Sequence, residues 1–125
     1  MPRLLVADDA VIIREIIKDT ARAAGWEIAG EAANGAQAVE QFQQLRPDVV
    51  TLDMVMPEYD GMYALRAILE QDPQARVLVV SALDQRQVLK DAFKIGAADF
   101  IVKPFDKKML VESLNRILGV GAVSA

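Results

Sequence analysis

Acidic residues stand directly at the ends of two apolar segments of this chain. Asp8 and Asp9 follow Arg3–Ala7, and Asp53 ends the apolar run Val49–Asp53. Carboxylates about 4 Å apart repel by about 4 kcal/mol at an effective dielectric constant of about 20, so acids that meet must protonate, separate or bind a cation. Oxygen ligands without histidine or cysteine suit a hard ion, and few protein ligands plus water suit Mg²⁺ better than Ca²⁺. These acids are therefore candidate Mg²⁺ ligands.

Two further polar side chains end later apolar segments. Ser81 follows Val77–Val80, and Lys103 follows Ala98–Val102. The carboxyl ends of parallel strands meet at one edge of a sheet, where such folds place their ligand chemistry. The hydroxyl and the ammonium are therefore expected to converge on the same edge as the three carboxylates.

The elements that position these residues alternate along the chain. Strands are predicted at Arg3–Ala7, Trp26–Ala32, Val49–Asp53, Val77–Val80 and Ala98–Val102. Helical periodicity predicts helices from Val11 to about Ala23, Asn34 to about Leu45, about Gly61 to Glu70, Asp84 to near Gly96, and Asp106 through Ile117. This alternation predicts an α/β fold with parallel strands, right-handed crossovers and helices on both faces. We expect a flavodoxin-like, doubly wound, five-stranded sheet of order 2-1-3-4-5.

Local signals mark the ends of several predicted elements. Asn34 with Gln37, and Asp84 with Gln87, have the spacing of capping boxes at helix starts. Gly25 is a suitable stop for the first helix. The alternating segment Trp26–Ala32 indicates a strand near the sheet edge, whereas Val49–Asp53 is expected to be central and buried on both faces.

Composition narrows the function further. The 125 residues are expected to form one domain over 1–119 with a frayed tail over 120–125. The absence of cysteine and histidine excludes disulfides, thiolate sites, a Ser-His-Asp triad and phosphohistidine chemistry on this chain. The net charge of −4 argues against direct nucleic-acid binding. The start of the chain is not typical of a signal peptide, and no apolar run approaches the roughly 20 residues of a membrane span, so a cytoplasmic protein is expected.

Five landmarks in order along the chain resemble the response-regulator receiver domain. They are Asp8-Asp9, then Asp53 with Met56-Pro57, then Asp60-Gly61, then Ser81-Ala82, and finally Lys103-Pro104-Phe105. The resemblance covers essentially the whole chain. Within the family it is strongest to the single-domain chemotaxis regulators, especially over Asp48–Pro57 and Gly96–Phe105.

The resemblance implies a set of roles at the predicted site. Asp53 is implied to be the phosphoacceptor, with a partner histidine kinase as donor. The implied Mg²⁺ ligands are Asp8, Asp9, Asp53 and the backbone carbonyl of Val55. Ser81 and Lys103 would contact the phosphoryl oxygens, and the Lys103–Pro104 peptide bond would be cis. The chain would catalyse its own phosphorylation and slow dephosphorylation without being a conventional enzyme.

The resemblance also implies a switch. Ser81 would move to hydrogen-bond the phosphoryl group, and Phe100, at the aromatic switch position, would turn inward into the space left behind. Because Phe100 lacks a hydroxyl, its inward state needs no hydrogen-bond partner. The face of the fourth helix, fifth strand and fifth helix would then bind a flagellar motor switch protein or other output protein. Val55 and Leu83 stand at positions that border the phosphoryl group in the family, and because both are apolar here, slow hydrolysis and a separate phosphatase are expected.

Simpler interpretations exist for each residue taken alone. Asp9 could cap the following helix, Ser81 could be a structural hydroxyl, and Phe100 could belong to the core. Lys103 alone could be solvated or ion-paired, and Asp53 alone could form a turn. For Arg14 and Lys18 a solvated helix face is the expectation.

Other functions remain to be compared with a receiver. A haloacid-dehalogenase-type, Mg²⁺-dependent phosphohydrolase would need a second carboxylate at the position of Val55. A flavodoxin-like cofactor binder would need a glycine-rich phosphate loop after the first strand, where this chain has Asp8-Asp9-Ala10. Within the receiver class, the alternatives are a phosphorelay carrier and a receiver cut from a longer DNA-binding regulator. The 125 residues leave no room for an output domain beside the receiver.

Overall fold

The computed structural model describes residues 1–82 and 86–119, and its strands form one parallel sheet of order β2-β1-β3-β4-β5. The strands are β1 (Arg3–Ala7), β2 (Glu27–Ala32), β3 (Val49–Asp53), β4 (Val77–Ala82) and β5 (Asp99–Lys103). The helices are α1 (Val11–Ala23), α2 (Gly35–Leu45), α3 (Gly61–Gln71), α4 (Arg86–Ile95) and α5 (Lys107–Leu118). The predicted fold class and strand order are confirmed.

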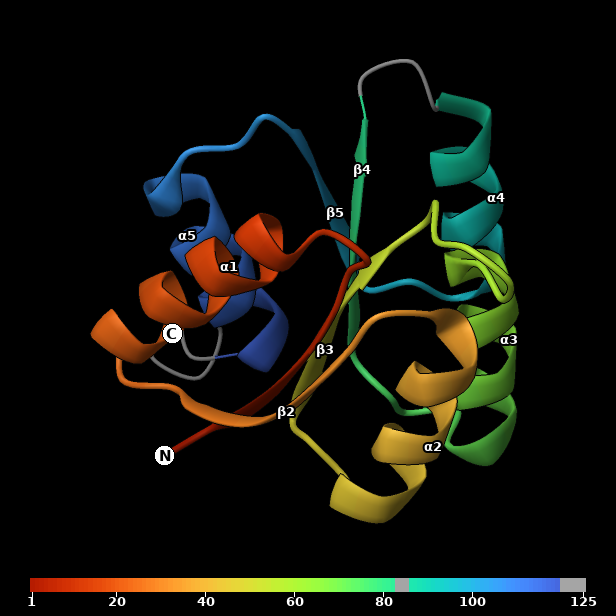
Figure 1. Cartoon of the computed structure of the whole chain (residues 1–125), viewed down its shortest axis with the longest axis horizontal. Helices are drawn as coiled ribbons and strands as arrows, with labels where there is room; N and C mark the ends of the chain where they lie inside the picture. The colour runs from red at the N-terminus through yellow and green to blue at the C-terminus, as the bar shows by residue number, and fades with distance from the viewer. Residues whose placement is uncertain (83–85, 120–125) are drawn as a thin grey trace.

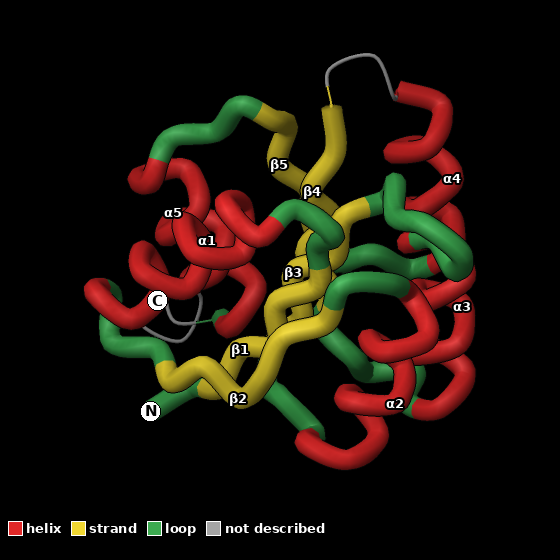
Figure 2. The backbone as a smooth tube through the Cα atoms, viewed as in Figure 1, coloured by secondary structure: helices red, strands yellow, loops and turns green. Residues whose placement is uncertain are grey.

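The sheet lies between two layers of helices. Helices α1 and α5 cover one face, and α2, α3 and α4 cover the other (Figures 1 and 2). Each face has its own apolar core. Val50 and Leu52 of β3 contribute to the core under α2–α4, while Val49 points to the core under α1 and α5. Because both faces are covered, β3 is buried along its whole length, as the run Val49–Leu52, apolar apart from Thr51, predicts.

Side-chain caps define the starts of three helices. The side chains of Asn34, Asp60 and Asp106 accept hydrogen bonds from the backbone N–H groups of Gln37, Tyr63 and Met109. The Gln37 side chain returns to the N–H of Ala33, one residue before the cap, so the predicted capping box at this helix is slightly shifted. The second predicted box depends on Asp84, which lies outside the described residues, as does the predicted tail 120–125.

The second strand confirms one prediction and refines another. It lies at the edge of the sheet, beside β1 alone. Gly25 follows α1 with φ +93°, the left-handed conformation that ends a helix. Trp26 lies between this turn and β2 rather than in the strand, and it is buried in the core under α1 and α5.

The predicted solvated face for Arg14 and Lys18 is wrong. Lys18 is only 7 % exposed, and its ammonium lies 2.7 Å from carboxylate oxygens of both Glu15 and Glu31. Arg14 Nε lies 2.8 Å from the Glu31 carboxylate. Helical periodicity gives the apolar side of α1, but it cannot show that an acid of β2 lies beside its polar side.

Candidate functional site

Three carboxylates meet at the carboxyl edge of the sheet. Asp8, Asp9 and Asp53 each offer an oxygen within 4.8 Å of the others. The pairing of β1 with β3 causes this, because Ala7 lies opposite Leu52 and the chain places an acid directly after each of them. Asp8 and Asp53 are 1 % and 5 % exposed, whereas Asp9 is exposed. The cluster therefore has two buried charges and one that faces solvent.

Lys103 reaches this cluster from β5. Its Nζ lies 2.9 Å from Asp8 Oδ2 and 3.5 Å from Asp53 Oδ2. Three carboxylates against one ammonium leave a formal charge of −3 + 1 = −2 when all are ionised. A divalent cation would balance this charge, and an all-oxygen donor set with one solvent-facing member suits Mg²⁺, which keeps several of its waters. The residues present therefore fit the ion that the family resemblance implies.

Burial and the neighbouring charges shift the pKa of Asp53. The pKa of Asp53 is raised from 3.8 to about 6, chiefly by burial, then by the charge of Asp8 and, to a smaller extent, by that of Asp9. The Lys103 ammonium and the Val55 N–H oppose this rise in the pKa. Burial lowers the pKa of Lys103, but its hydrogen bond to Asp8 and the charge of Asp53 outweigh that effect, so this pKa is raised.

The loop between β1 and α1 holds Asp8 in place. Its Oδ1 accepts a hydrogen bond of 2.9 Å from the N–H of Ala10, and its backbone carbonyl accepts one of 2.7 Å from Arg14 Nη1. The cap position of α1 is Ala10, with no side-chain capping bond. Asp9 therefore does not cap the helix, which removes its simpler interpretation.

The loop between β3 and α3 lies close behind Asp53. Val55 donates its N–H to Asp53 Oδ1 at 3.3 Å, and its side chain is exposed. Gly61 donates to the Met54 carbonyl at 3.1 Å. A Cβ at Gly61 would overlap the Asp53 carbonyl oxygen and would lie 2.6 Å from Met54 Cα. Only glycine allows the start of α3 to approach Asp53 and Met54 this closely.

Ser81 lies beside the same edge on the neighbouring strand. It is fully buried and opposite Val102 of β5, and the residue before it, Val80, is opposite Asp53. Lys103 continues into a cis peptide bond with Pro104, as the resemblance implied. The remaining predicted rate-tuning residue, Leu83, lies outside the described residues.

Phe100 lies on the surface shared by α4 and β5. Its side chain is 39 % exposed, so the simpler prediction of a core residue is wrong. The ring packs edge-to-face on Phe93, with 5.4 Å between centroids and 86° between planes. The two rings border a cavity of about 290 Å³ whose other lining residues are Arg86, Leu89, Lys90 and Val102. The aromatic ring is thus in an outward position in this structure.

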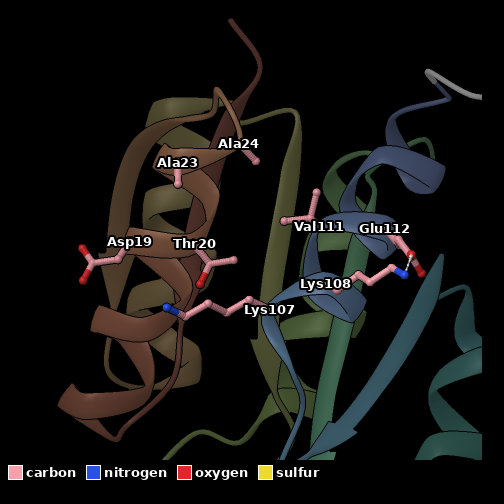
Figure 3. A pocket seen from close by; sticks show the side chains of 8 residues that line it. All are labelled: Asp19, Thr20, Ala23, Ala24, Lys107, Lys108, Val111 and Glu112. Atoms are coloured by element: carbon pink, nitrogen blue, oxygen red, sulfur yellow. Dashed lines mark ion pairs between the residues drawn. The ribbon is translucent and has the colours of Figure 1, made fainter.

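A cavity of about 400 Å³ between α1 and α5 lies apart from this chemistry (Figure 3). Its lining residues are Asp19, Thr20, Ala23, Ala24, Lys107, Lys108, Val111 and Glu112. The lining contains neither Lys103 nor any of the three clustered acids. The candidate site is therefore identified by the convergence of charged groups and not by the volume of a cavity.

Comparison with known proteins identifies the family. The family model for the response regulator receiver domain matches residues 4–115. The chemotaxis protein CheY of Thermotoga maritima is 47 % identical over 115 residues, which cover 92 % of this chain and 96 % of that protein. A chain of the CheX-CheY-BeF3-Mg+2 complex from Borrelia burgdorferi superposes with a TM-score of 0.88 at 35 % identity, covering 92 % and 87 % of the two chains. The chain belongs to the response regulator receiver family.

The family assignment decides between the classes considered above. Receiver domains of this kind are phosphoacceptor switches and not conventional enzymes, so a phosphohydrolase and a flavodoxin-like cofactor binder are set aside. Receivers also occur within longer proteins. A protein-glutamate methylesterase/protein-glutamine glutaminase of Alkalilimnicola ehrlichii is 49 % identical over 128 residues, which cover 95 % of this chain but 33 % of that protein.

One further structural observation concerns membranes. Within residues 1–82 and 86–119, every helix is too short or too polar to cross a bilayer.

Proposed function

We propose that this protein is a phosphorylation-activated response regulator that takes a phosphoryl group from a histidine kinase onto Asp53. The observation that carries the proposal is the meeting of Asp53 with Asp8, Asp9 and the Lys103 ammonium at one sheet edge. The similarity to CheY over 92 % of the chain supports chemotaxis as the process that it serves.

Mg²⁺ binding is part of this proposal. The ligands would be Asp8, Asp9, Asp53 and the Val55 carbonyl. When bound, the ion supplies positive charge to the oxygens of the transferring phosphoryl group. The net charge of the cluster and its oxygen-only chemistry support the assignment.

Three residues of the chain, Asp53, Lys103 and Ser81, would carry out the phosphoryl transfer. The Asp53 carboxylate oxygen forms the new O–P bond as the N–P bond of the donor phosphohistidine breaks, and the imidazole leaves with the bonding electrons. Because this transition state is loose, positioning and charge neutralisation supply most of the catalysis. Lys103 Nζ already lies within 3.5 Å of Asp53, from where it would pair with a phosphoryl oxygen. The Ser81 hydroxyl would donate to another phosphoryl oxygen.

Phosphorylation would then change the surface formed by α4, β5 and α5. A phosphoryl group adds roughly two negative charges and strong acceptor oxygens. Movement of Ser81 toward it would leave space beneath β4 for the Phe100 ring, which in the present structure lies outward on Phe93. The output partner, a flagellar motor switch protein or another target, would prefer the surface with the ring turned inward.

We infer slow loss of the phosphoryl group and a separate phosphatase. Val55 and Leu83 are apolar, so neither can orient an attacking water by hydrogen bonding. A chain of the CheX-CheY-BeF3-Mg+2 complex from Borrelia burgdorferi is similar to this protein, which makes a CheX-like protein a candidate partner here.

A phosphorelay carrier or a receiver from a longer regulator is the second candidate. The protein-glutamate methylesterase/protein-glutamine glutaminase named above is 49 % identical, and the match covers only a third of its length. This similarity supports the candidate of a receiver from a longer regulator. The net charge of −4 argues against direct nucleic-acid binding by this domain in either case.

Phosphotransfer from a labelled histidine kinase tests the proposal. Label should pass to the protein in the presence of Mg²⁺ and should not pass to Asp53→Asn. Affinity capture with and without beryllofluoride and Mg²⁺ would then identify the output partner by its preference for the activated state. Equal labelling of Asp53→Asn would reject the proposed phosphoacceptor. Return of the label to a second histidine-containing protein would favour the phosphorelay candidate.

A further inference from the structure

Asp8 directly follows β1, and both its backbone N–H and its backbone carbonyl form hydrogen bonds with residues outside that strand. Its N–H donates to the Ala32 carbonyl at 3.0 Å, at the end of the edge strand β2. Its carbonyl accepts from Arg14 Nη1 at 2.7 Å. This carbonyl belongs to the planar peptide group that joins Asp8 to Asp9, so one hydrogen bond fixes the plane from which both acids project. The guanidinium of Arg14 therefore binds the peptide group that joins two candidate metal ligands.

The guanidinium is itself firmly held. Arg14 Nε lies 2.8 Å from Glu31 Oε1, and the Arg14 side chain is 14 % exposed. The second carboxylate oxygen of Glu31 is 2.7 Å from Lys18 Nζ, and its backbone carbonyl accepts from Gln41 Nε2 at 2.7 Å. Hydrogen bonds from Lys18 and Arg14 lower the pKa of Glu31, so this carboxylate remains charged at neutral pH. The chain of contacts runs from α2 through β2 and α1 to the peptide between Asp8 and Asp9.

We propose that Arg14, anchored by Glu31, is a positioning residue for the Mg²⁺ site. It does not touch the ion but aims the Asp8 and Asp9 carboxylates toward it. Arginine suits this task because its planar fork can serve the Glu31 carboxylate and the Asp8 carbonyl at once, which a lysine ammonium cannot do with the same geometry. The inference rests on the Mg²⁺-dependent phosphorylation proposed above and assigns a role there to residues that the sequence motifs do not include.

A purely structural role for the same contacts makes a different prediction. Arg14 and Glu31 also tie α1 to the edge strand β2, and loss of that tie would lower the stability of the fold without altering metal affinity at temperatures where the protein is folded. Arg3 provides a matched control for this possibility. Its Nη1 donates to the Leu45 carbonyl at 2.6 Å and its Nε lies 3.7 Å from Glu27 of β2, but it stands at the opposite end of β1 from Asp8.

Titration of MgCl₂ into the protein without phosphodonor, followed by backbone amide shifts of residues near Asp8, tests the inference. Loss of such indirect support for metal ligands lowers affinity by about tenfold or more, so Arg14→Gln should bind Mg²⁺ about tenfold more weakly than the wild type. Arg14→Lys should lose less, since it keeps the charge, and Arg3→Gln should bind as the wild type does. Thermal unfolding of each variant sets a temperature at which all are folded.

The outcomes separate this inference from the proposed function. If the wild type binds Mg²⁺ and the Mg²⁺ affinity of Arg14→Gln is no lower than that of Arg3→Gln, the inference is overturned while the proposed function stands. Wild-type protein that binds no Mg²⁺ overturns the proposed metal-dependent function and the inference with it. If Arg14→Gln does not fold, Glu31→Gln takes its place, because it removes the anchor while keeping the guanidinium. Its affinity must then fall below that of Arg3→Gln for the inference to stand.

Discussion

Replacement of Asp53 by asparagine should stabilise the metal-free protein at neutral pH. The pKa of Asp53 is raised from 3.8 to about 6 in the folded state, chiefly by burial and then by the charge of Asp8. Between these two values the native state holds a proton that the unfolded chain has lost, so stability rises as the pH falls from 7 toward 4. The difference of 6 − 3.8, about 2 pKa units, corresponds to about 3 kcal/mol of lost stability at pH 7.

Asparagine removes this cost but also weakens the pairing with Lys103, which lies 3.5 Å from the Asp53 carboxylate. The expected gain at pH 7 is therefore about 1–3 kcal/mol in the free energy of unfolding. The gain should shrink steadily as the pH is lowered through 6 and should be smallest near pH 4, where the folded-state carboxyl is protonated and the pH is close to the unfolded-state pKa of 3.8. Added Mg²⁺ should stabilise the wild type and reduce the advantage of the variant.

Urea denaturation followed by tryptophan fluorescence measures this effect. The chain has one tryptophan, Trp26, which is 2 % exposed in the core under α1 and α5, so its emission reports global unfolding. Curves for wild type and Asp53→Asn at several pH values between 4 and 8, each with and without MgCl₂, give the difference directly. A variant no more stable than wild type at pH 7, or an advantage that does not change with pH, would refute the electrostatic account of the cluster.

Three further substitutions test other parts of the structure. Gly61→Ala should destabilise the fold by about 1–3 kcal/mol in urea denaturation, because its Cβ overlaps the Asp53 carbonyl; an unchanged midpoint would contradict this close approach. Thr51→Val should stabilise the protein by about 1 kcal/mol in the same assay, because the Thr51 hydroxyl is buried without a hydrogen-bond partner among the described residues. A loss of stability would show that this hydroxyl is satisfied. Val55→Asn should shorten the lifetime of the acyl phosphate, measured by decay of label after kinase removal, and an unchanged lifetime would reject the proposed role of Val55.

The fold was largely predictable from the sequence because its determinants are local. The run Val49–Leu52, apolar apart from Thr51, predicts a strand covered on both faces, and β3 is buried throughout. Asn34 and Asp106 mark helix starts, because each side chain accepts a hydrogen bond from the backbone N–H three residues further on. Such caps can be predicted from the local sequence. The meeting of Asp8 with Asp53 also followed, since parallel strands end at a common edge.

The sequence predictions that proved wrong concern contacts between different elements of the fold. Arg14 and Lys18 pair with Glu31, 17 and 13 residues away, and nothing in the helical period of α1 specifies which strand residue lies beside its polar side. Phe100 was open to a core interpretation because its residue type favours burial, yet the edge strand β5 leaves it on the surface against Phe93. Periodicity assigns a face to each side chain but does not tell which neighbour covers that face.

The most direct test of the central claim is to map the phosphorylated residue. The protein is incubated with acetyl phosphate with and without Mg²⁺, the acyl phosphate is trapped by borohydride reduction, and the modified peptide is identified by mass spectrometry. The convergence of Asp53, Asp8 and Lys103 predicts Mg²⁺-dependent modification at Asp53 and none in Asp53→Asn. Modification at another residue, or modification of Asp53 that proceeds equally well without Mg²⁺, would contradict it.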